Sequence, residues 1–128
     1  MRRRVSEIAL LVPDYEAAIA FYVGVLGFDL RSDIDLGAGK RWVTVAPEGA
    51  ETALLLARAA DDRQRAAIGA QAGGRVAFFL ETDDFPRDHR QMTDRGVIFE
   101  EAPRHEDYGI VAVWRDPFGN RWDLLQRR

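Results

Sequence analysis

A single carboxylate, Asp123, lies in an otherwise apolar segment near the C-terminus and is the first candidate for chemistry. Residues 110–114 and 122–125 are apolar, and the Asp-Pro-Phe-Gly-Asn segment between them, residues 116–120, favours a tight turn joining two strands. Loss of water in an apolar setting raises a carboxyl pKa toward values that suit a general acid or base. The alternative is a buried ion network that binds no substrate.

Glu7 is a second carboxylate of this kind, because it is the only charge in the apolar segment 5–12. Paired carboxylates can cleave glycosides, but no other feature of the chain supports that reaction. The chain has no cysteine, and no serine nucleophile constellation is visible. The glycine-rich segments 37–39 and 73–74 lack the capped helix and the lysine of a phosphate-binding loop.

Trp114 is the first aromatic candidate for a ligand contact. A turn over residues 116–119 would pair Ala112 with Asp123, so we expect Trp114 to share the inward face of Asp123 and to stack on a planar ligand. Trp122, adjacent to Asp123, should point the opposite way, into the core under the helices.

Other polar and aromatic side chains could complete such a site. Trp42 lies on the corresponding strand of the first half of the chain, where a core position and a ligand contact are both compatible with the sequence. Arg41 could meet an anionic ligand at the mouth of a cavity, or could form a solvated strand end. The polar loop containing His105 could close over the site, with Tyr108 as a hydrogen-bonding contact. His89 lies on the apolar stripe of a helix and is interpreted as a half-buried structural histidine.

The elements that must position these side chains occur in the same order twice. Aspartates that suit N-caps and glycines that suit C′ positions delimit one helix in each half. In the first half we expect strands at residues 5–12, 28–36, 40–46 and 52–57, and a helix between Asp14 and Gly27. In the second half we expect strands at residues 75–80, 97–102, 110–115 and 122–125, and a helix between Asp84 and Gly96.

The two halves also match in sequence. Residues 7–12 resemble residues 75–80, and residues 45–49 resemble residues 115–119. A repeat of about 70 residues with one helix in each copy predicts a duplicated βαβββ module.

The predicted organisation is a single domain of residues 1–128. Its first module spans residues 5–57 and its second module spans residues 75–126. Between them, residues 58–74 are interpreted as a linker with one or two helical turns around residues 63–68.

Composition is that of an ordinary globular protein, with 47% hydrophobic and 30% charged residues. The net charge of −3 is too small to argue for a nucleic-acid partner or an anionic membrane. The lack of cysteine suits a reducing compartment, and no apolar run approaches the length of a membrane span. We therefore expect a cytoplasmic protein with no nucleic-acid and no membrane partner.

Three groups of motifs carry a resemblance to a known family. They are Ile8-Ala-Leu-Leu-Val-Pro-Asp14, Ala20-Phe-Tyr22 with Val25-Leu-Gly-Phe28, and Asp116-Pro-Phe-Gly-Asn120 before Trp122-Asp-Leu124. In this order and spacing, the chain resembles the vicinal oxygen chelate superfamily, which includes glyoxalase I, bleomycin resistance proteins and extradiol dioxygenases. The resemblance implies an α+β fold of two tandem βαβββ modules, each forming a half-barrel sheet around a shared cavity, in a homodimer.

The resemblance also implies where a metal would be held. Metal-using relatives ligate the ion from four strand positions, which fall here on Glu7, Leu55, Arg75 and Asp123. The usual ligands at these positions are His and Glu. Leu55 has no donor atom, and the protonated Arg75 has no lone pair to give and repels a cation. We therefore expect no cofactor, and a divalent metal bound by Glu7 and Asp123 is the alternative.

The primary functional hypothesis follows from this substitution. We expect Arg75 to pair with Glu7, Asp123 or both, in a cavity that binds a small, partly apolar molecule without a metal, as in the bleomycin resistance branch. Glu7, Leu55, Arg75, Trp114 and Asp123 are expected to line this cavity. The alternatives are a metal-dependent lyase, isomerase or dioxygenase with Glu7 and Asp123 as remaining ligands, and a metal-free enzyme with Asp123 as general base.

Overall fold

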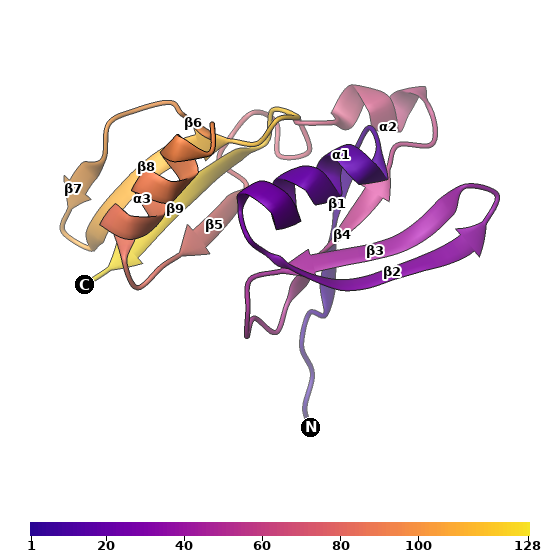
Figure 1. Ribbon diagram of the computed structural model, residues 1–128, viewed down its shortest axis with the longest axis horizontal. Coiled ribbons are helices and arrows are strands. Elements are labelled where there is room, and N and C mark those ends of the chain that lie inside the picture. The colour runs from indigo at the N-terminus through magenta and orange to yellow at the C-terminus, as the bar shows by residue number, and fades with distance from the viewer. The chain divides into compact units, whose positions relative to one another are not determined.

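The computed structural model describes all residues from Met1 to Arg128. The chain divides into two compact units, Met1–Ile68 and Gly69–Arg128, each built from one sheet with a helix on it (Figure 1). The first unit contains β1 (Glu7–Val12), α1 (Tyr15–Ile19), η1 (Ala20–Val25), β2 (Asp29–Gly37), β3 (Lys40–Ala46), β4 (Ala53–Arg58) and α2 (Asp62–Ala67). The second unit contains β5 (Phe78–Glu81), α3 (Phe85–Asp94), β6 (Ile98–Phe99), β7 (Arg104–Glu106), β8 (Gly109–Arg115) and β9 (Arg121–Arg127). The predicted mixed α+β class with one sheet in each half is confirmed.

The sheet of the first unit has the strand order β1-β4-β3-β2, with β1 and β4 parallel and the other pairs antiparallel. Side chains alternate between its two faces, so one face carries residues that are fully buried. These are Leu10, Val12, Val43, Val45 and Leu56. Because Arg41 shares this face and its guanidinium reaches Glu16 of α1, the buried face is the one that the helix covers.

The helix of the first unit begins where the sequence predicts. The Asp14 carboxylate accepts a hydrogen bond from the Glu16 backbone N–H at 2.9 Å, which caps α1. The helix continues as the π-helical segment η1 and ends at Gly27, whose φ of 79° favours glycine.

The sheet of the second unit has the strand order β5-β9-β8-β6, with β7 paired to the outer part of β8. Its core is aromatic on the face under α3, where Trp122 stacks on Phe78 and on Trp114 with ring centroids 4.7 and 5.0 Å apart. His89 of α3 stacks on Phe85 and lies 4.3 Å from the Phe99 ring, centroid to centroid. The structural role predicted for His89 is confirmed.

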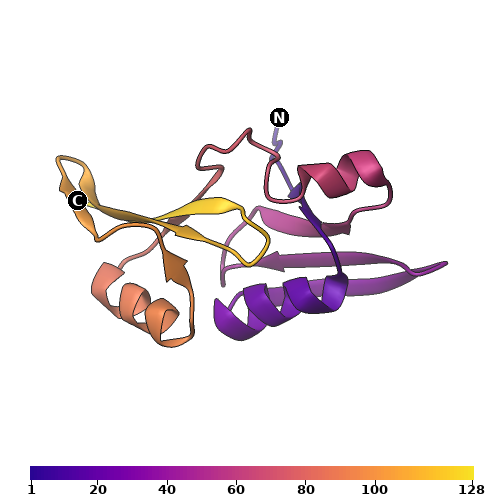
Figure 2. The same cartoon turned by 90° about the horizontal axis from the view of Figure 1, so that it is seen from above.

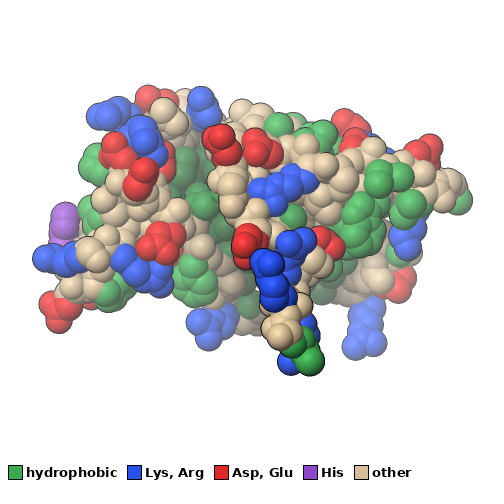
Figure 3. Space-filling view, turned by 90° about the horizontal axis from the view of Figure 1, so that it is seen from below, with side chains coloured by type: hydrophobic (Ala, Val, Ile, Leu, Met, Phe, Trp, Pro, Cys, Tyr) green, Lys and Arg blue, Asp and Glu red, His purple; other side chains and the backbone are tan.

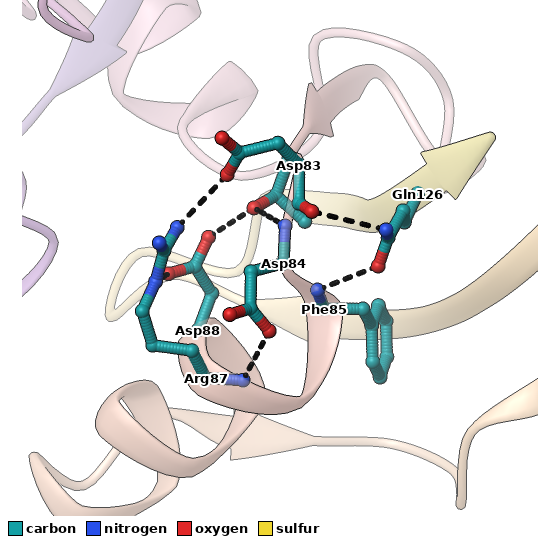
Figure 4. A network of polar contacts seen from close by, with 7 residues as sticks. Asp83, Asp84, Phe85, Arg87, Asp88 and Gln126 are labelled. Atoms are coloured by element: carbon teal, nitrogen blue, oxygen red, sulfur yellow. Dashed lines mark hydrogen bonds and ion pairs between the residues drawn. The ribbon is translucent and has the colours of Figure 1, made fainter.

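A polar network fixes the start of α3 (Figure 4). The Asp84 carboxylate accepts from the Arg87 backbone N–H, and the Gln126 side chain of β9 accepts from the Phe85 N–H at 2.8 Å. Asp88, in the first turn, accepts from the Arg87 guanidinium and from the Thr82 hydroxyl. These contacts join the helix to the sheet that it covers.

Two strand predictions and one loop prediction in the second half differ from the structure. The strand predicted at residues 75–80 begins only at Phe78, because Gly73 and Gly74 adopt positive φ and turn the chain before it. The strand predicted at residues 97–102 is limited to Ile98–Phe99. Beyond it, the Glu101 carboxylate, rather than a backbone carbonyl, accepts from the Val113 N–H at 2.9 Å, which interrupts the ladder.

The third difference concerns the polar loop predicted around His105. It contains β7, which pairs with the first residues of β8. At the start of β8, Gly109 has a φ of 148° and lets β9 approach closely, because an added Cβ would lie 2.0 Å from the Gln126 carbonyl oxygen.

The helical turns predicted around residues 63–68 are confirmed as α2, which Asp61 caps by accepting a hydrogen bond from the Gln64 backbone N–H.

The helix α3 and the sheet that it covers are also seen in the second view (Figure 2). None of the helices is long and apolar enough to cross a membrane.

Candidate functional site

We call the face of each sheet that lies opposite α1 or α3 the helix-free face; in the first unit the short helix α2 contacts the edge strand β1. In the second unit, Asp123 of β9 lies on this face because its neighbours Trp122 and Leu124 point into the core under α3. The register places Phe79 of β5 and Val113 of β8 directly beside Asp123. Phe79 is 56% exposed, so an aromatic surface is available next to the carboxylate.

The Asp123 carboxylate is incompletely satisfied by the protein. Its Oδ1 atom is buried, and no backbone or side-chain group of the protein donates a hydrogen bond to it. Burial raises the pKa of Asp123, and the charge of Glu101 acts in the same direction, while Arg104 and Arg121 oppose the shift. The net effect is a pKa above the ordinary value of 3.8, as expected for a carboxyl group with poor solvation.

Both arginines near Asp123 bind other acceptors. The Arg121 Nε lies 2.8 Å from Glu100 Oε2, and its Nη1 donates to the Gly74 carbonyl at 3.1 Å. The Arg104 Nε lies 2.9 Å from Glu101 Oε1, and its Nη1 lies 3.1 Å from Glu106. Asp123 therefore experiences their charge but accepts none of their hydrogen bonds.

The predicted pairing of Arg75 with Asp123 is wrong. Arg75 is exposed, lies before the start of β5, and donates from Nε to the Val76 carbonyl at 3.0 Å. No hydrogen bond or ion pair joins it to Asp123. The turn at Gly73 and Gly74 causes this placement, because it keeps Arg75 out of the strand.

The predicted equivalence of Glu7 and Arg75 is also wrong, by two residues. Leu10 pairs with Leu56 in the first sheet, and Leu80 pairs with Leu124 in the second. Matching these pairs also superposes the two N-cap aspartates, Asp14 and Asp84. In this alignment Leu55 corresponds to Asp123, as predicted, and the counterpart of Glu7 is Ala77.

In the first unit, Glu7, Leu55 and Trp42 all lie on the helix-free face, as their alternation with buried residues requires. Glu7 is exposed and accepts from the Ser6 hydroxyl at 3.1 Å. Trp42 is 37% exposed and lies opposite Ile34 of β2, so it is not part of the core under α1.

The expected position of Trp114 on the face of Asp123 is wrong. Val113, not Ala112, pairs with Asp123, and Trp114 pairs with Trp122. Trp114 is fully buried on the face under α3. The hairpin loop is one residue longer than predicted, because Asp116 N donates to the carbonyl of residue 120 and Arg115 forms the last pair with Arg121.

The structure also assigns Arg41 to a different role. Its guanidinium makes two hydrogen bonds to Asp33, at 3.0 and 2.6 Å, and one to Glu16 at 2.5 Å. These carboxylates hold the pKa of Arg41 above its ordinary value. Arg41 lies on the face under α1, where it links β2, β3 and the helix, and its charge is already matched.

His105 lies in β7, where it pairs with Ile110, and Tyr108 lies in the turn between β7 and β8. Both are exposed, and the Tyr108 carbonyl accepts from the Arg128 N–H at 3.0 Å. Tyr108 also interacts with the Arg104 side chain, whose charge acts on Asp123. A ligand contact for Tyr108 remains a prediction.

The residues do not fit the metal site of the superfamily. Leu55 and Ala77 have no donor atoms, and Arg75 is a cation outside the strand. No group of three or more His, Cys, Asp or Glu side chains converges anywhere in the structure. We therefore derive no chemistry through a metal.

A hollow of about 490 Å³ lies elsewhere, at the N-terminal segment, where Arg2, Arg3, Arg4 and Glu51 line it. On the face shown in Figure 3, basic and acidic side chains are interspersed. All four residues that line this hollow are charged, and Asp123 is not one of them.

Sequence reasoning missed the side chains that surround Asp123, namely Phe79, Arg104 and Arg121. The two N-cap aspartates were the available signal. The alignment of Asp14 with Asp84 matches Ala9 with Phe79 and Glu7 with Ala77, whereas the pairing of Phe79 with Asp123 is given only by the strand register.

Comparison with known proteins gives the class of the chain. The family described as Glyoxalase/Bleomycin resistance protein/Dioxygenase superfamily matches residues 4–124. The chain belongs to this superfamily, and the fold predicted from the resemblance is confirmed.

Individual relatives cover nearly the whole chain. An uncharacterized protein of Shewanella frigidimarina is 51% identical over 128 residues, which span 98% of this chain and 95% of the relative. The crystal structure of UcmS2 is similar with a TM-score of 0.85 and 29% identity, over 98% of each chain. The structure of TnmS3, an antibiotic binding protein from Streptomyces sp. CB03234, is similar with a TM-score of 0.80 and 33% identity, over 99% of this chain and 98% of that chain.

Proposed function

We propose that this protein binds a small, partly apolar molecule without a metal, and that the helix-free face around Asp123 is part of the binding site. The similarity to TnmS3, which is described as an antibiotic binding protein, carries this proposal because it extends over nearly the full length of both chains. The exposed Phe79 ring and the partly unsatisfied Asp123 carboxylate support it, since ligand sites combine apolar surface with a few polar groups.

A thermal-shift screen against hydrophobic antibiotics, thiol adducts and catechols tests this proposal. A ligand that binds only the folded state raises the melting temperature, and above Kd this rise grows with the logarithm of the ligand concentration. We expect at least one class to stabilise the protein, with Phe79→Ala reducing the shift. Failure of every class to stabilise the protein counts against the proposal.

The second candidate is a metal-free enzyme with Asp123 as general base and Glu7 as a further tentative catalytic group. The raised pKa of Asp123 favours it, because a base works best when its pKa approaches the working pH. An Asp123→Asn variant that loses turnover of a bound compound but retains its binding would identify this activity. A variant with unchanged turnover would exclude Asp123 as the base.

The metal-dependent lyase, isomerase or dioxygenase is disfavoured by the residues at the superfamily ligand positions. Homodimerisation and a cytoplasmic location are further proposals that come from the superfamily resemblance. Sedimentation of the purified protein would test the dimer, which requires twice the mass of a 14.5 kDa chain.

A further inference from the structure

The environment of Asp123 also indicates the chemistry of the ligand, and this inference rests on the proposed function. We propose that the ligand is a flat apolar molecule that presents an N–H or O–H donor to Asp123, and that anionic ligands are excluded from this position.

The hydrogen-bond inventory of the helix-free face carries the first step. Asp123 Oδ1 is buried and receives no hydrogen bond from the protein. The guanidinium groups of Arg104 and Arg121 lower the pKa of this carboxyl only through their charge. An ionised carboxylate has several acceptor positions, and leaving one buried and unbonded is unfavourable. The buried Oδ1 leaves the carboxylate poorly solvated, so a ligand donor that reaches the other oxygen, Oδ2, would gain more than at a fully solvated carboxylate.

The charge balance carries the second step. Arg121 and Arg115 both contact Glu100, and Arg104 contacts Glu101 and Glu106. With Asp123 included, these groups carry three positive and four negative charges, a formal net charge of −1. Every one of these arginines already contacts a glutamate, although Arg115 and Arg121 share Glu100, so the face offers an anionic ligand no unpaired cation, and Asp123 repels it.

The apolar surroundings carry the third step. Phe79, Val113 and Leu125 share the face of Asp123 and lie on its three strands. Exposed Phe79 can stack against an aromatic ring whose edge carries the donor group. A planar ring with one polar substituent fits this combination better than a flexible or highly charged molecule does.

A matched series of naphthalenes tests the inference by fluorescence or calorimetric titration. The series is 2-naphthol, 2-naphthylmethylamine, 2-methoxynaphthalene and 2-naphthoate, which share one ring system and differ only in the substituent. We expect the naphthol, the amine or both to bind roughly tenfold or more tightly than the methoxy compound, with the naphthoate weakest. Comparison of the naphthol with the amine shows whether the site prefers a neutral O–H donor or a cationic N–H donor.

Two variants give the controls. Asp123→Leu should abolish the preference for donors and leave the affinity for 2-methoxynaphthalene within about twofold. Phe79→Ala should weaken all four compounds alike and keep their order. Circular dichroism establishes that each variant is folded, and Asp123→Val, which also lacks an acceptor, replaces the leucine variant if that one unfolds.

The outcomes separate this inference from the proposed function. Equal binding of all four compounds, tightest binding of 2-naphthoate, or a donor preference that survives in Asp123→Leu would overturn the inference and leave small-molecule binding intact. Absence of binding by every naphthalene, together with a negative thermal-shift screen, would overturn both.

Discussion

At the residue scale, Asp123 is a charged side chain that makes no hydrogen bond stabilising the fold. It lies on β9 with a buried oxygen that lacks a donor, next to arginines that bind other carboxylates. A group that served only stability would be expected to have its hydrogen bonds satisfied within the protein. The sequence could indicate this carboxylate because Asp123 interrupts an apolar strand, but it could not give its partners, since these depend on contacts between strands far apart in the chain.

The raised pKa of Asp123 gives a prediction with a definite sign. A raised folded-state pKa means that the folded protein binds the proton more tightly than the unfolded chain, so this group favours folding below the ordinary value of 3.8 and ceases to do so as the pH rises through the folded-state value. Asp123→Asn should therefore be as stable as the wild type, or more stable by up to about 1 kcal/mol, at pH 7. The difference should shrink as the pH falls to about 4.

Urea unfolding of the folded protein at several pH values measures this difference. Asp107→Asn, a change at the exposed β7–β8 turn, is the matched control for loss of one negative charge. A loss of more than about 1 kcal/mol at pH 7 in Asp123→Asn would instead show that the carboxylate stabilises the fold.

At the element scale, hydrogen bonds at the ends of strands and helices decide where each element lies. The caps at Asp14 and Asp84 and the glycine at the end of each helix were predictable, because the residue types match local backbone needs. The register of the β8–β9 hairpin was not. The Asp116 carboxylate accepts from the backbone N–H groups of Phe118 and Asn120, which stabilises a five-residue loop. That one extra residue moved Trp114 to the opposite face.

The network at the start of α3 predicts a pH-dependent loss of stability. Burial raises the pKa of Asp88, but hydrogen bonds from Arg87 and Thr82 outweigh burial, and the net pKa is below 3.8. The stability from Asp88 is therefore complete above the ordinary carboxyl pKa and is lost as the pH falls through the lower folded-state value. Asp88→Asn should cost about 1 kcal/mol at neutral pH, and this cost should decline in acid.

Asp83→Asn is the comparison for this network, because Asp83 also contacts Arg87 but is 90% exposed at its side chain. We expect its effect to be under about 0.5 kcal/mol. Thermal unfolding of both variants across the acid range measures the two effects. Equal losses in the two variants would contradict a special role for Asp88.

The β7–β8 turn beside Tyr108 gives a third prediction. Gly109→Ala should destabilise the protein by more than about 2 kcal/mol, because the new Cβ would lie 2.0 Å from the Gln126 carbonyl oxygen and the φ of 148° disfavours alanine. Gly24→Ala in η1 is the control, since nothing lies within 4 Å of its Cβ position. It should be neutral or stabilising by up to about 1 kcal/mol. Comparable melting temperatures of the two variants would be inconsistent with this close approach.

At the scale of the whole molecule, the chain contains a βαβββ unit in each half, with the short strand β7 added in the second, and it belongs to the Glyoxalase/Bleomycin resistance protein/Dioxygenase superfamily. The duplication and the fold class could be predicted from periodicity, caps and motif order. Apolar residues alone could not give the residue-by-residue match of the first strands, because two apolar strands align equally well in registers that differ by two residues. The N-cap aspartates and the strand pairing agree that Ala77, not Arg75, corresponds to Glu7.

The central claim, binding of a small molecule without a metal, is tested most directly by one calorimetric titration. The strongest ligand from the thermal-shift screen is titrated into protein treated with a chelator, and into the same protein supplemented with zinc, iron or manganese. We predict dissociation constants that agree within about twofold, since Leu55, Ala77 and Arg75 provide no ligands. Binding that disappears with the chelator and returns with a stoichiometric metal would contradict the account.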